Sequence, residues 1–327
     1  MIRIMVIGRG LLPVVLLLLW SSSHAASKPV QPPPEGYDHA KFAPEPDILK
    51  VFRGFAVSFD SKDDDDGDPG PDLLRVPHWV GQEIRRWEPP MNDQEDDEAW
   101  CLDTLKKRPK WFTDPDLYAS GVAGNDDSYR SSGFDRGHMA MKLLVERLGK
   151  DAAYNTHTVL NAIPQRPKFN RAIWQSLEIL TGAWAQTYGQ IWVIQGPIFY
   201  DLRTVSWIGD DDERRIAVPD AVFKVVDRFK TAAEKEKVAP RDKEAPAVLA
   251  FLYPQVGPGY FGSSDEFRHA RFLTTIDEIE ELTGLDFKPS DDPRVERTLE
   301  RTPATELWDP PVVDRNDRRN FVPACRS

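Results

Sequence analysis

Residues 131–178 constrain the fold of this chain more than any other stretch of its 327 residues. Residues 156–163 are rich in β-branched and apolar side chains and stop at Pro164, which is typical of a strand. Over residues 169–188 apolar side chains recur at helical spacing, and Gly189 is a stop signal. The helical pattern consists of Ile173, Trp174, Leu177, Leu180 and Trp184. We therefore expect a strand followed closely by an amphipathic helix.

Further apolar segments predict additional strands downstream. Residues 191–200 and 247–254 have the composition of buried strands, whereas residues 275–283 favour a short helix. Strands mixed with segregated helices argue for an α+β fold, and we expect a mixed, mainly antiparallel sheet with flanking helices.

The N-terminus has the features of a secretory signal peptide over residues 1–25. Arg3 and Arg9 precede an apolar run at residues 11–20, and Ser23 and Ala25 are small residues that suit cleavage. An uncleaved membrane anchor is the alternative, but the run is shorter than the roughly 20 apolar residues that a span needs. We expect a secreted or periplasmic protein without stable membrane association after cleavage.

The rest of the chain divides by composition into three parts. Residues 26–50 are rich in proline and predict an extended linker, residues 51–288 are long enough for one domain, and residues 289–327 form a polar tail. The cysteines are Cys101 and Cys325. In an exported protein they form either one disulfide or two unpaired thiols, and the sequence leaves both open.

The charge distribution is uneven along the chain. Without Arg3 and Arg9, 40 of the 42 basic residues remain against 53 acidic ones, a net charge of −13. Two Asp-rich stretches, residues 63–68 and 93–98, carry much of the acid and are typical of solvated loops. Residues 106–171 instead hold twelve basic and seven acidic side chains. Positive charge is thus enriched where the candidate catalytic residues lie.

Three side chains within or shortly after this basic stretch suit metal-assisted hydrolysis. His138 has an unperturbed pKa near 6.5 and is a candidate general base. Asn170 offers a neutral oxygen to Mg²⁺, although its place at a predicted helix start equally suits an N-cap. In an ideal helix Glu178 lies about 12 Å and about 80° from Asn170, so we expect it to act on the metal through water.

These residues belong to a recognisable pattern. The box Asp135-Arg136-Gly137-His138 is followed by Asn161 near a strand end and by Asn170 and Glu178, eight residues apart. The pattern resembles the DNA/RNA non-specific endonuclease family, the ββα-metal nucleases. The resemblance implies a ββα-metal core, a Mg²⁺ cofactor with Mn²⁺ as a substitute, and cleavage of DNA and RNA to 5′-phosphate ends.

The resemblance also suggests residues that contact the substrate. Arg108, before an aromatic pair and Asp-Pro, is similar to a phosphate-binding arginine of the family, with Lys106 or Lys107 as alternatives. Arg136 either binds phosphate or braces its loop, and we also assign Asn161 to substrate binding.

The sequence departs from the family pattern at one position. The family often has a basic residue four positions beyond the glutamate, where this chain has Gly182. Arg171 and Lys168 are the candidates to replace that basic residue at the phosphate.

The sequence therefore predicts an exported, Mg²⁺-dependent endonuclease that is indifferent to the sugar. Two alternatives remain open at this point. One is a nucleic-acid-binding module with weak or no activity, and the other is a phosphodiesterase that acts on small substrates. The presence of all three residues His138, Asn170 and Glu178 favours the enzyme.

Overall fold

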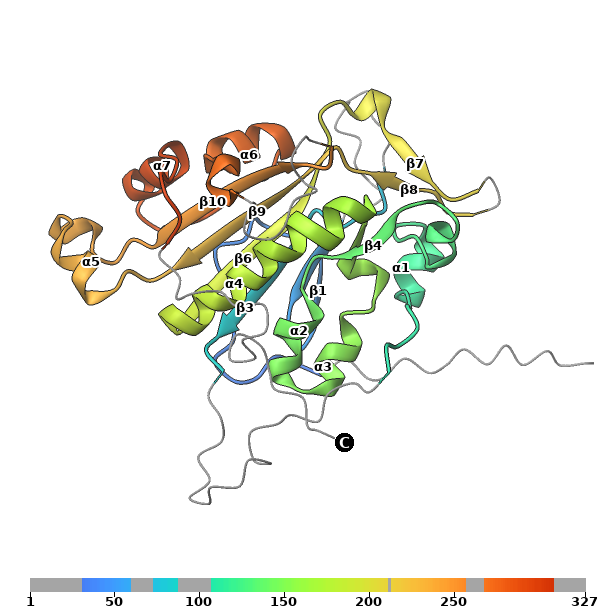
Figure 1. Cartoon of the computed structure of the whole chain (residues 1–327), viewed down its shortest axis with the longest axis horizontal. Coiled ribbons are helices and arrows are strands. Elements are labelled where there is room, and N and C mark those ends of the chain that lie inside the picture. Colours follow the sequence, from blue (N-terminus) through green and yellow to red (C-terminus); the bar gives the residue numbers. More distant parts are fainter. Residues whose placement is uncertain (1–30, 60–72, 88–106, 211–212, 257–267, 309–327) are drawn as a thin grey trace, which may run out of the picture.

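The computed structural model describes residues 31–59, 73–87, 107–210, 213–256 and 268–308 (Figure 1). Its architecture confirms the α+β fold. A seven-stranded sheet has the order β1-β2-β3-β6-β9-β10-β11, and each neighbouring pair is antiparallel. The strands are β1 (Ile48–Val51), β2 (Ala56–Phe59), β3 (Trp79–Arg85), β6 (Gln190–Ile198), β9 (Ala221–Arg228), β10 (Ala247–Pro254) and β11 (Leu273–Thr274).

Both faces of this sheet are buried, as the strand composition predicts. In β9, Val222 and Val226 belong to one apolar cluster and Phe223 and Val225 to another, because successive side chains point to opposite faces. Helix α4 (Gln175–Tyr188) crosses the first face (Figure 1), and α6 (Ile276–Thr283) packs on the second. The other helices are α1 (Pro115–Ser120), α2 (Lys142–Val145), α3 (Lys150–Asn155), α5 (Ala232–Glu236) and α7 (Pro293–Arg301).

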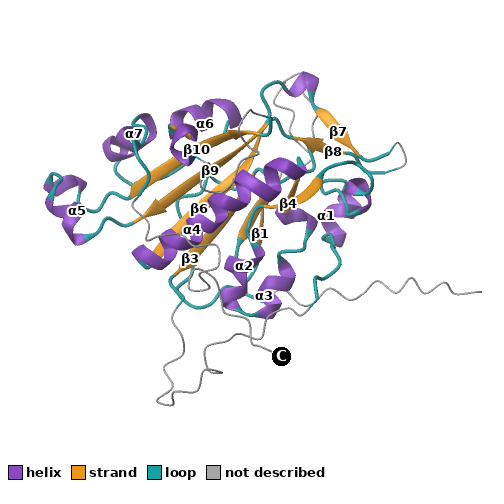
Figure 2. Cartoon of the chain, in the orientation of Figure 1, coloured by secondary structure: helices purple, strands orange, loops and turns teal. Residues whose placement is uncertain are grey.

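Two small hairpins lie outside the main sheet. Strand β7 (Ser206–Ile208) pairs with β8 (Ile216–Val218), and β4 (Asp135–His138) pairs with β5 (Ala162–Gln165). The β4-β5 hairpin precedes the helical segment that ends in α4, which gives the strand, strand, helix order (Figure 2). The expected strand at residues 156–163 is wrong in its extent. A turn at residues 156–157 and a 3₁₀ turn, Val159–Asn161, occupy most of it, and pairing with β4 begins only at Ala162.

The helix after β5 starts earlier than its apolar pattern indicates. Helical backbone begins at Pro167, which suits the first turn of a helix because proline lacks an amide proton. The segment Phe169–Trp174 is a π-helix, in which the amide of Gln175 donates to the carbonyl of Asn170, five residues back. Gly189 ends the helix as predicted, with φ of 89°.

Residues 31–47 are not the extended linker that their proline content predicts. His39 is buried, and its Nδ1 accepts a hydrogen bond from the amide of Glu83 in β3 at 3.0 Å. Trp192 Nε1 donates to the carbonyl of Asp38 at 3.1 Å. At Gly81 a Cβ would lie 2.2 Å from the carbonyl of His39, so glycine permits this close approach. The segment is therefore part of the domain.

The polar tail is also partly folded. Residues 293–301 form α7, and beyond it Trp308 accepts a hydrogen bond on its carbonyl from Trp184 Nε1 of α4 at 3.2 Å. The domain thus extends past residue 288. The predicted signal peptide, both Asp-rich stretches, Lys106, Cys101 and Cys325 lie outside the described residues. Within the described ranges, no helix combines the length and apolar character needed to cross a membrane.

Candidate active site

A cavity of about 190 Å³ opens between the β4-β5 hairpin and the helical segment that leads into α4. It brings together all three residues of the predicted hydrolytic site, His138, Asn170 and Glu178. Its full lining is His138, Met141, Lys142, Leu143, Asn170, Arg171, Gln175 and Glu178. The chain therefore gathers residues from a strand, the loop and helix after it, and a distant helix at one place.

His138 ends β4 and is held in a group of aromatic rings. Its ring centroid lies 4.7 Å from that of Trp111 and 5.1 Å from that of His157. Its Nε2 is buried without a hydrogen-bond partner among the described residues. Burial lowers the pKa of His138 well below 6.5, and the neighbouring His157 and Arg108 lower it further. The ring is therefore neutral at pH 7, which is the form that accepts a proton.

Asn170 and Glu178 line the same cavity because of the π-helix. Eight residues of ideal α-helix would separate their directions by about 80°. The π turn inserts one extra residue without the rotation of about 100° that this residue would contribute in an α-helix. The angle between the directions of Asn170 and Glu178 changes by that amount, so the two side chains lie on nearly the same side of the helix. Gln175 lines the cavity as well, although it is five residues after Asn170. The ideal-helix estimate from the sequence is therefore wrong for this segment.

Asn170 is not the N-cap that its place in the sequence allowed. Its backbone amide donates to the carbonyl of Arg166 at 2.9 Å, so it lies within the helical segment. Its side-chain Nδ2 donates to Asp135 Oδ2 at 3.0 Å. This bond orients the amide and leaves its carbonyl oxygen as the atom suited to a metal ion.

Glu178 is buried, and its Oε1 has no hydrogen-bond partner among the described residues. Burial raises the pKa of this carboxyl, and the buried Lys224 of β9 only partly opposes the shift. An isolated buried carboxylate is costly, whereas a cation beside it favours the charged form. A carboxyl in this condition at a cavity wall is suited to a positive ion in the cavity.

Asp135 connects the two sides of the site. It accepts hydrogen bonds from Asn170 and from Arg171, whose Nε and Nη2 lie 2.8 and 2.5 Å from its two oxygens. Burial alone would raise the pKa of Asp135, but these bonds outweigh it and lower the pKa. Asp135 is therefore an anion that orients Asn170 and Arg171.

The predicted phosphate-binding residues differ in how close they lie to the cavity. Arg171 lines the cavity and its side chain is 70% exposed, so it is accessible to a phosphate despite its ion pair. Arg108 is exposed, and its positive charge acts on both His138 and Asp135. Its guanidinium carbon lies 6.0 Å from the centroid of Trp111. Lys168 is exposed but does not line the cavity.

Arg136 and Asn161 do not line the cavity, and each has structural contacts. Arg136 Nη2 donates to the carbonyl of Asp126 at 2.9 Å, its Nε pairs with the Asp126 carboxylate, and its guanidinium stacks on Tyr129. Of the two roles open to it, the geometry favours bracing the loop.

The substrate contact that we expected from Asn161 is not supported, because its side chain has no exposed surface. Its Oδ1 accepts from the amide of Ala140 at 2.8 Å, and its Nδ2 donates to the carbonyls of Ala140 and Thr156, both at 3.0 Å. Asn161 therefore fixes the backbone just after His138.

Gly137 explains the third position of the Asp-Arg-Gly-His box. A Cβ at this position would lie 2.1 Å from Oε1 of the buried Gln165 in the paired strand. Glycine therefore allows β4 and β5 to pack closely enough to place His138 at the cavity.

Two polar residues that line the cavity were not identified from the sequence. Lys142 lies four residues after His138, and its Nζ bonds both oxygens of Glu146 at 2.8 Å. Its position on a helix just beyond the box was a usable signal. Gln175 gave no such signal, because only the π turn brings it to the side of Asn170.

The donor set fits a hard divalent cation such as Mg²⁺. The carbonyl oxygen of Asn170 and the unpartnered Oε1 of Glu178 are oxygen donors. Mg²⁺ commonly uses one or two protein oxygens and keeps several waters. Arg108 and Arg171 supply the positive charge that a phosphodiester needs on the outer side.

Comparison with known proteins agrees with this geometry. The model of the DNA/RNA non-specific endonuclease family matches residues 55–293. The mouse mitochondrial nuclease EXOG is 26% identical over 223 residues, covering 66% of this chain and 53% of its own. Human mitochondrial endonuclease G is 28% identical over 182 residues, covering 54% and 55%. The chain thus spans about half the length of these relatives.

A solved structure has the same fold. A chain from the crystal structure of an EndoG/EndoGI complex superposes with a TM-score of 0.53 at 21% identity, covering 78% of this chain and 93% of that one. The ββα order around the cavity therefore occurs within an architecture that other proteins share.

Proposed function

Because the chain belongs to the DNA/RNA non-specific endonuclease family, we propose that it hydrolyses phosphodiester bonds in both DNA and RNA. The observation that carries this proposal is the meeting of His138, Asn170 and Glu178 in one cavity. These residues come from two separate elements, and all three are groups that phosphodiester hydrolysis requires.

His138 acts as the general base in this proposal. A neutral imidazole takes the proton from the attacking water, and its lowered pKa keeps it neutral at and below pH 7. Trp111 packs against the ring at a tilt and His157 packs against it edge-on, which holds it in place. Asn161 supports the same position by fixing the backbone at Ala140.

Asn170 and Glu178 would hold the Mg²⁺ ion, with Asp135 orienting the amide of Asn170. When bound, the ion neutralises the charge that develops on the phosphoryl and leaving oxygens. Arg171 and Arg108 bind the phosphate from the outer side, where their guanidinium groups are exposed. Lys142 adds a further positive charge at the cavity wall.

The size of the cavity supports a substrate that is a polymer contacted at its backbone. About 190 Å³ is below the roughly 300–1,000 Å³ of typical small-molecule pockets, so it accommodates a phosphodiester group but not a whole nucleotide. Water, and not the 2′-hydroxyl, is the nucleophile in this proposal, so DNA and RNA are both substrates. The family resemblance implies that the 3′-oxygen is the leaving group, which leaves the phosphate on the 5′ end of the product. We expect Mn²⁺ to support cleavage when it is supplied in place of Mg²⁺.

We also propose that the protein is exported after removal of residues 1–25. The apolar run at residues 11–20 follows two arginines and precedes small residues, which is the order of a secretory signal. Sequencing the N-terminus of the protein recovered from the medium or the periplasm tests this. A cell-retained protein that begins at Met1 would contradict it.

The function is tested by incubating the purified protein with supercoiled plasmid and with single-stranded RNA, each with Mg²⁺ and with EDTA. We expect cleavage of both polymers with Mg²⁺, loss of cleavage with EDTA, and 5′-phosphate ends. Cleavage of a chromogenic phosphodiester without cleavage of either polymer would instead indicate a small-molecule phosphodiesterase. Retention of plasmid on the protein without cleavage would indicate a binding module.

A further inference from the structure

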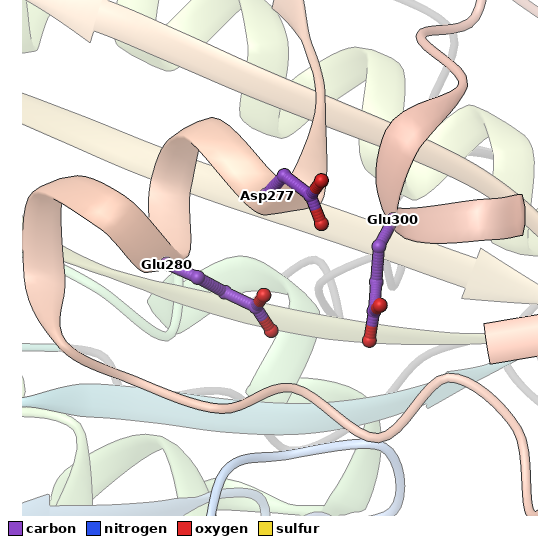
Figure 3. A group of neighbouring side chains, drawn as sticks. All are labelled: Asp277, Glu280 and Glu300. Atoms are coloured by element: carbon purple, nitrogen blue, oxygen red, sulfur yellow. The ribbon is translucent and has the colours of Figure 1, made fainter. Parts of the chain in front are cut away.

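A second group of oxygen ligands lies far along the chain, between α6 and α7. Asp277 and Glu280 extend from α6 and Glu300 from α7, and their carboxylates converge (Figure 3). One oxygen of each lies within 4.8 Å of one oxygen of each of the others. None of the three lines the cavity that holds His138.

Glu300 is the residue that makes this cluster unusual. It is only 9% exposed, and it is the one buried residue of α7, a nine-residue helix. It has no hydrogen bond or ion pair to any described residue, and Figure 3 shows its carboxylate pointing toward the other two. Burial raises the pKa of Glu300 to about 7, and the nearby Glu280 and Glu296 raise it too.

The other two carboxylates are held in place by bonds within the fold. Asp277 Oδ2 lies 3.3 Å from Nε of Arg301 in α7, and Glu280 Oε1 accepts a hydrogen bond from the amide of Phe287 at 2.7 Å. Arg301 is exposed, so its charge is screened by solvent and compensates the cluster only weakly. Burying a carboxylate against two others is unfavourable unless one carboxyl is protonated or a positive ion lies between them.

We propose that Asp277, Glu280 and Glu300 bind a Ca²⁺ ion that ties α7 to α6. Ca²⁺ binds oxygens at about 2.3–2.6 Å, so ligands on opposite sides of the ion lie up to about 5 Å apart. The carboxylate oxygens lie within 4.8 Å of one another, which is compatible with this spacing. Mg²⁺ usually keeps several waters and takes only one or two carboxylates, so three converging carboxylates favour Ca²⁺.

The ion's role follows from what α7 positions. After α7 the chain reaches Trp308, which packs edge-on against Trp184 and Tyr188 of α4. A tie between α6 and α7 thus fixes the segment that covers the distal end of the helix carrying Glu178. Glu300 lies beyond residue 293, where the family match ends. The ion is a structural element and takes no part in hydrolysis.

Thermal unfolding with and without about 5 mM Ca²⁺ tests the proposal, with Mg²⁺ present throughout at a fixed, saturating concentration. We expect Ca²⁺ to raise the Tm of the wild type by about 3–6 °C. Glu300→Gln keeps the shape of the side chain but removes a charged ligand, so the Tm of this variant should not rise when Ca²⁺ is added. Glu281→Gln on the exposed side of α6 makes the same chemical change outside the cluster and should respond as the wild type does.

Isothermal titration with CaCl₂ provides a second measurement if Glu300→Gln fails to fold. The wild type should bind one more Ca²⁺ per chain than Asp277→Asn, again with Mg²⁺ saturating. The proposal is overturned if Ca²⁺ leaves the wild-type Tm unchanged, or if Glu300→Gln responds as strongly as the wild type. Equal Ca²⁺ stoichiometry in Asp277→Asn and wild type would overturn it as well. Plasmid cleavage by Glu300→Gln at 25 °C should stay normal, which separates this site from the proposed nuclease activity.

Discussion

The cavity around His138 and the carboxylate cluster between α6 and α7 differ in the charges that surround their oxygen ligands. The cavity combines an imidazole, an amide and one carboxyl, and Arg108, Lys142 and Arg171 surround them with positive charge. The cluster has three carboxylates and one exposed cation, Arg301. A site that binds a phosphodiester needs positive charge beyond that of its metal ion, whereas a structural Ca²⁺ site needs only anionic oxygens.

The two regions also differ in how the fold builds them. The cavity depends on a hairpin and the helical segment after it, all within about 50 residues of sequence. The cluster depends on the packing of two helices near the end of the described chain. Each variant below should therefore affect one region and leave the other unchanged.

The largest effect should come from His138→Ala. A positioned base contributes typically 10²- to 10⁴-fold, so the initial rate of plasmid cleavage should fall by about that factor with the fold intact. His78→Ala is the matched control, because His78 is partly exposed and does not line the cavity. Near-normal cleavage by a folded His138→Ala protein would remove His138 from the mechanism.

The next largest effect should be on Mg²⁺ affinity, which should change in variants of the cavity and not in a variant of the carboxylate cluster. We expect Asn170→Ala to weaken the Mg²⁺ dependence of cleavage by more than tenfold, and Glu178→Ala by less, if Glu178 acts through water. The measurement is the Mg²⁺ concentration at half-maximal rate, with Glu300→Gln as the control that should match wild type. Equal midpoints for the Asn170 and Glu178 variants would show that the π turn allows Glu178 to bind the ion directly.

Two arginines near the cavity should give opposite patterns. Arg171→Ala removes an exposed guanidinium from the cavity, so KM for plasmid should rise several-fold and the dependence of log affinity on log salt should fall by about one. Arg136→Ala breaks the contacts with Asp126 and Tyr129, so it should lower the free energy of unfolding by about 1 kcal/mol with little change in KM. A rise in KM for Arg136→Ala alone would reverse these assignments.

The smallest effect should be a pH dependence of stability that originates at Glu300. Its pKa is about 7 in the folded protein and ordinarily 4.5, so the folded state binds more protons than the unfolded state between these values. The full pKa shift corresponds to about 3 kcal/mol, and solvent screening near the surface reduces it. Stability without Ca²⁺ should therefore decrease by about 1 kcal/mol as pH rises from 4.5 through 7. Chemical denaturation at pH 5 and pH 8 measures this. Glu300→Gln should lose less stability than the wild type between pH 5 and pH 8. An equal loss of stability in the variant and the wild type would contradict the assignment to Glu300.

Some structural features followed directly from residue type and spacing. Pro164 and Gly189 mark the strand and helix ends near the positions predicted for them. The apolar residues from Ile173 to Trp184 are buried as their spacing indicates. The box around His138 and the later Asn170 and Glu178 identified three side chains that the fold brings to one cavity. These features are local, because a few neighbouring residues decide them.

The remaining features depended on contacts between distant segments. The π turn is not visible in a hydrophobic pattern, and it alone changed the relation between Asn170 and Glu178. Arg136 and Asn161 have residue types that suit phosphate or substrate contact. In the fold, however, Arg136 bonds Asp126, and Asn161 bonds the backbone of Ala140. Residues 31–47 have the composition of a linker, yet His39 packs against Gly81.

By itself, the sequence determined the α+β class, the elements on either side of the site, and the residue types available for chemistry. Only the tertiary structure decided which of those side chains face the cavity, and it alone brought Glu300 to Asp277 and Glu280. The physical reason is that hydrophobic periodicity and turn residues act over a few positions. The partner of a polar side chain is set by packing between segments that the sequence does not place side by side.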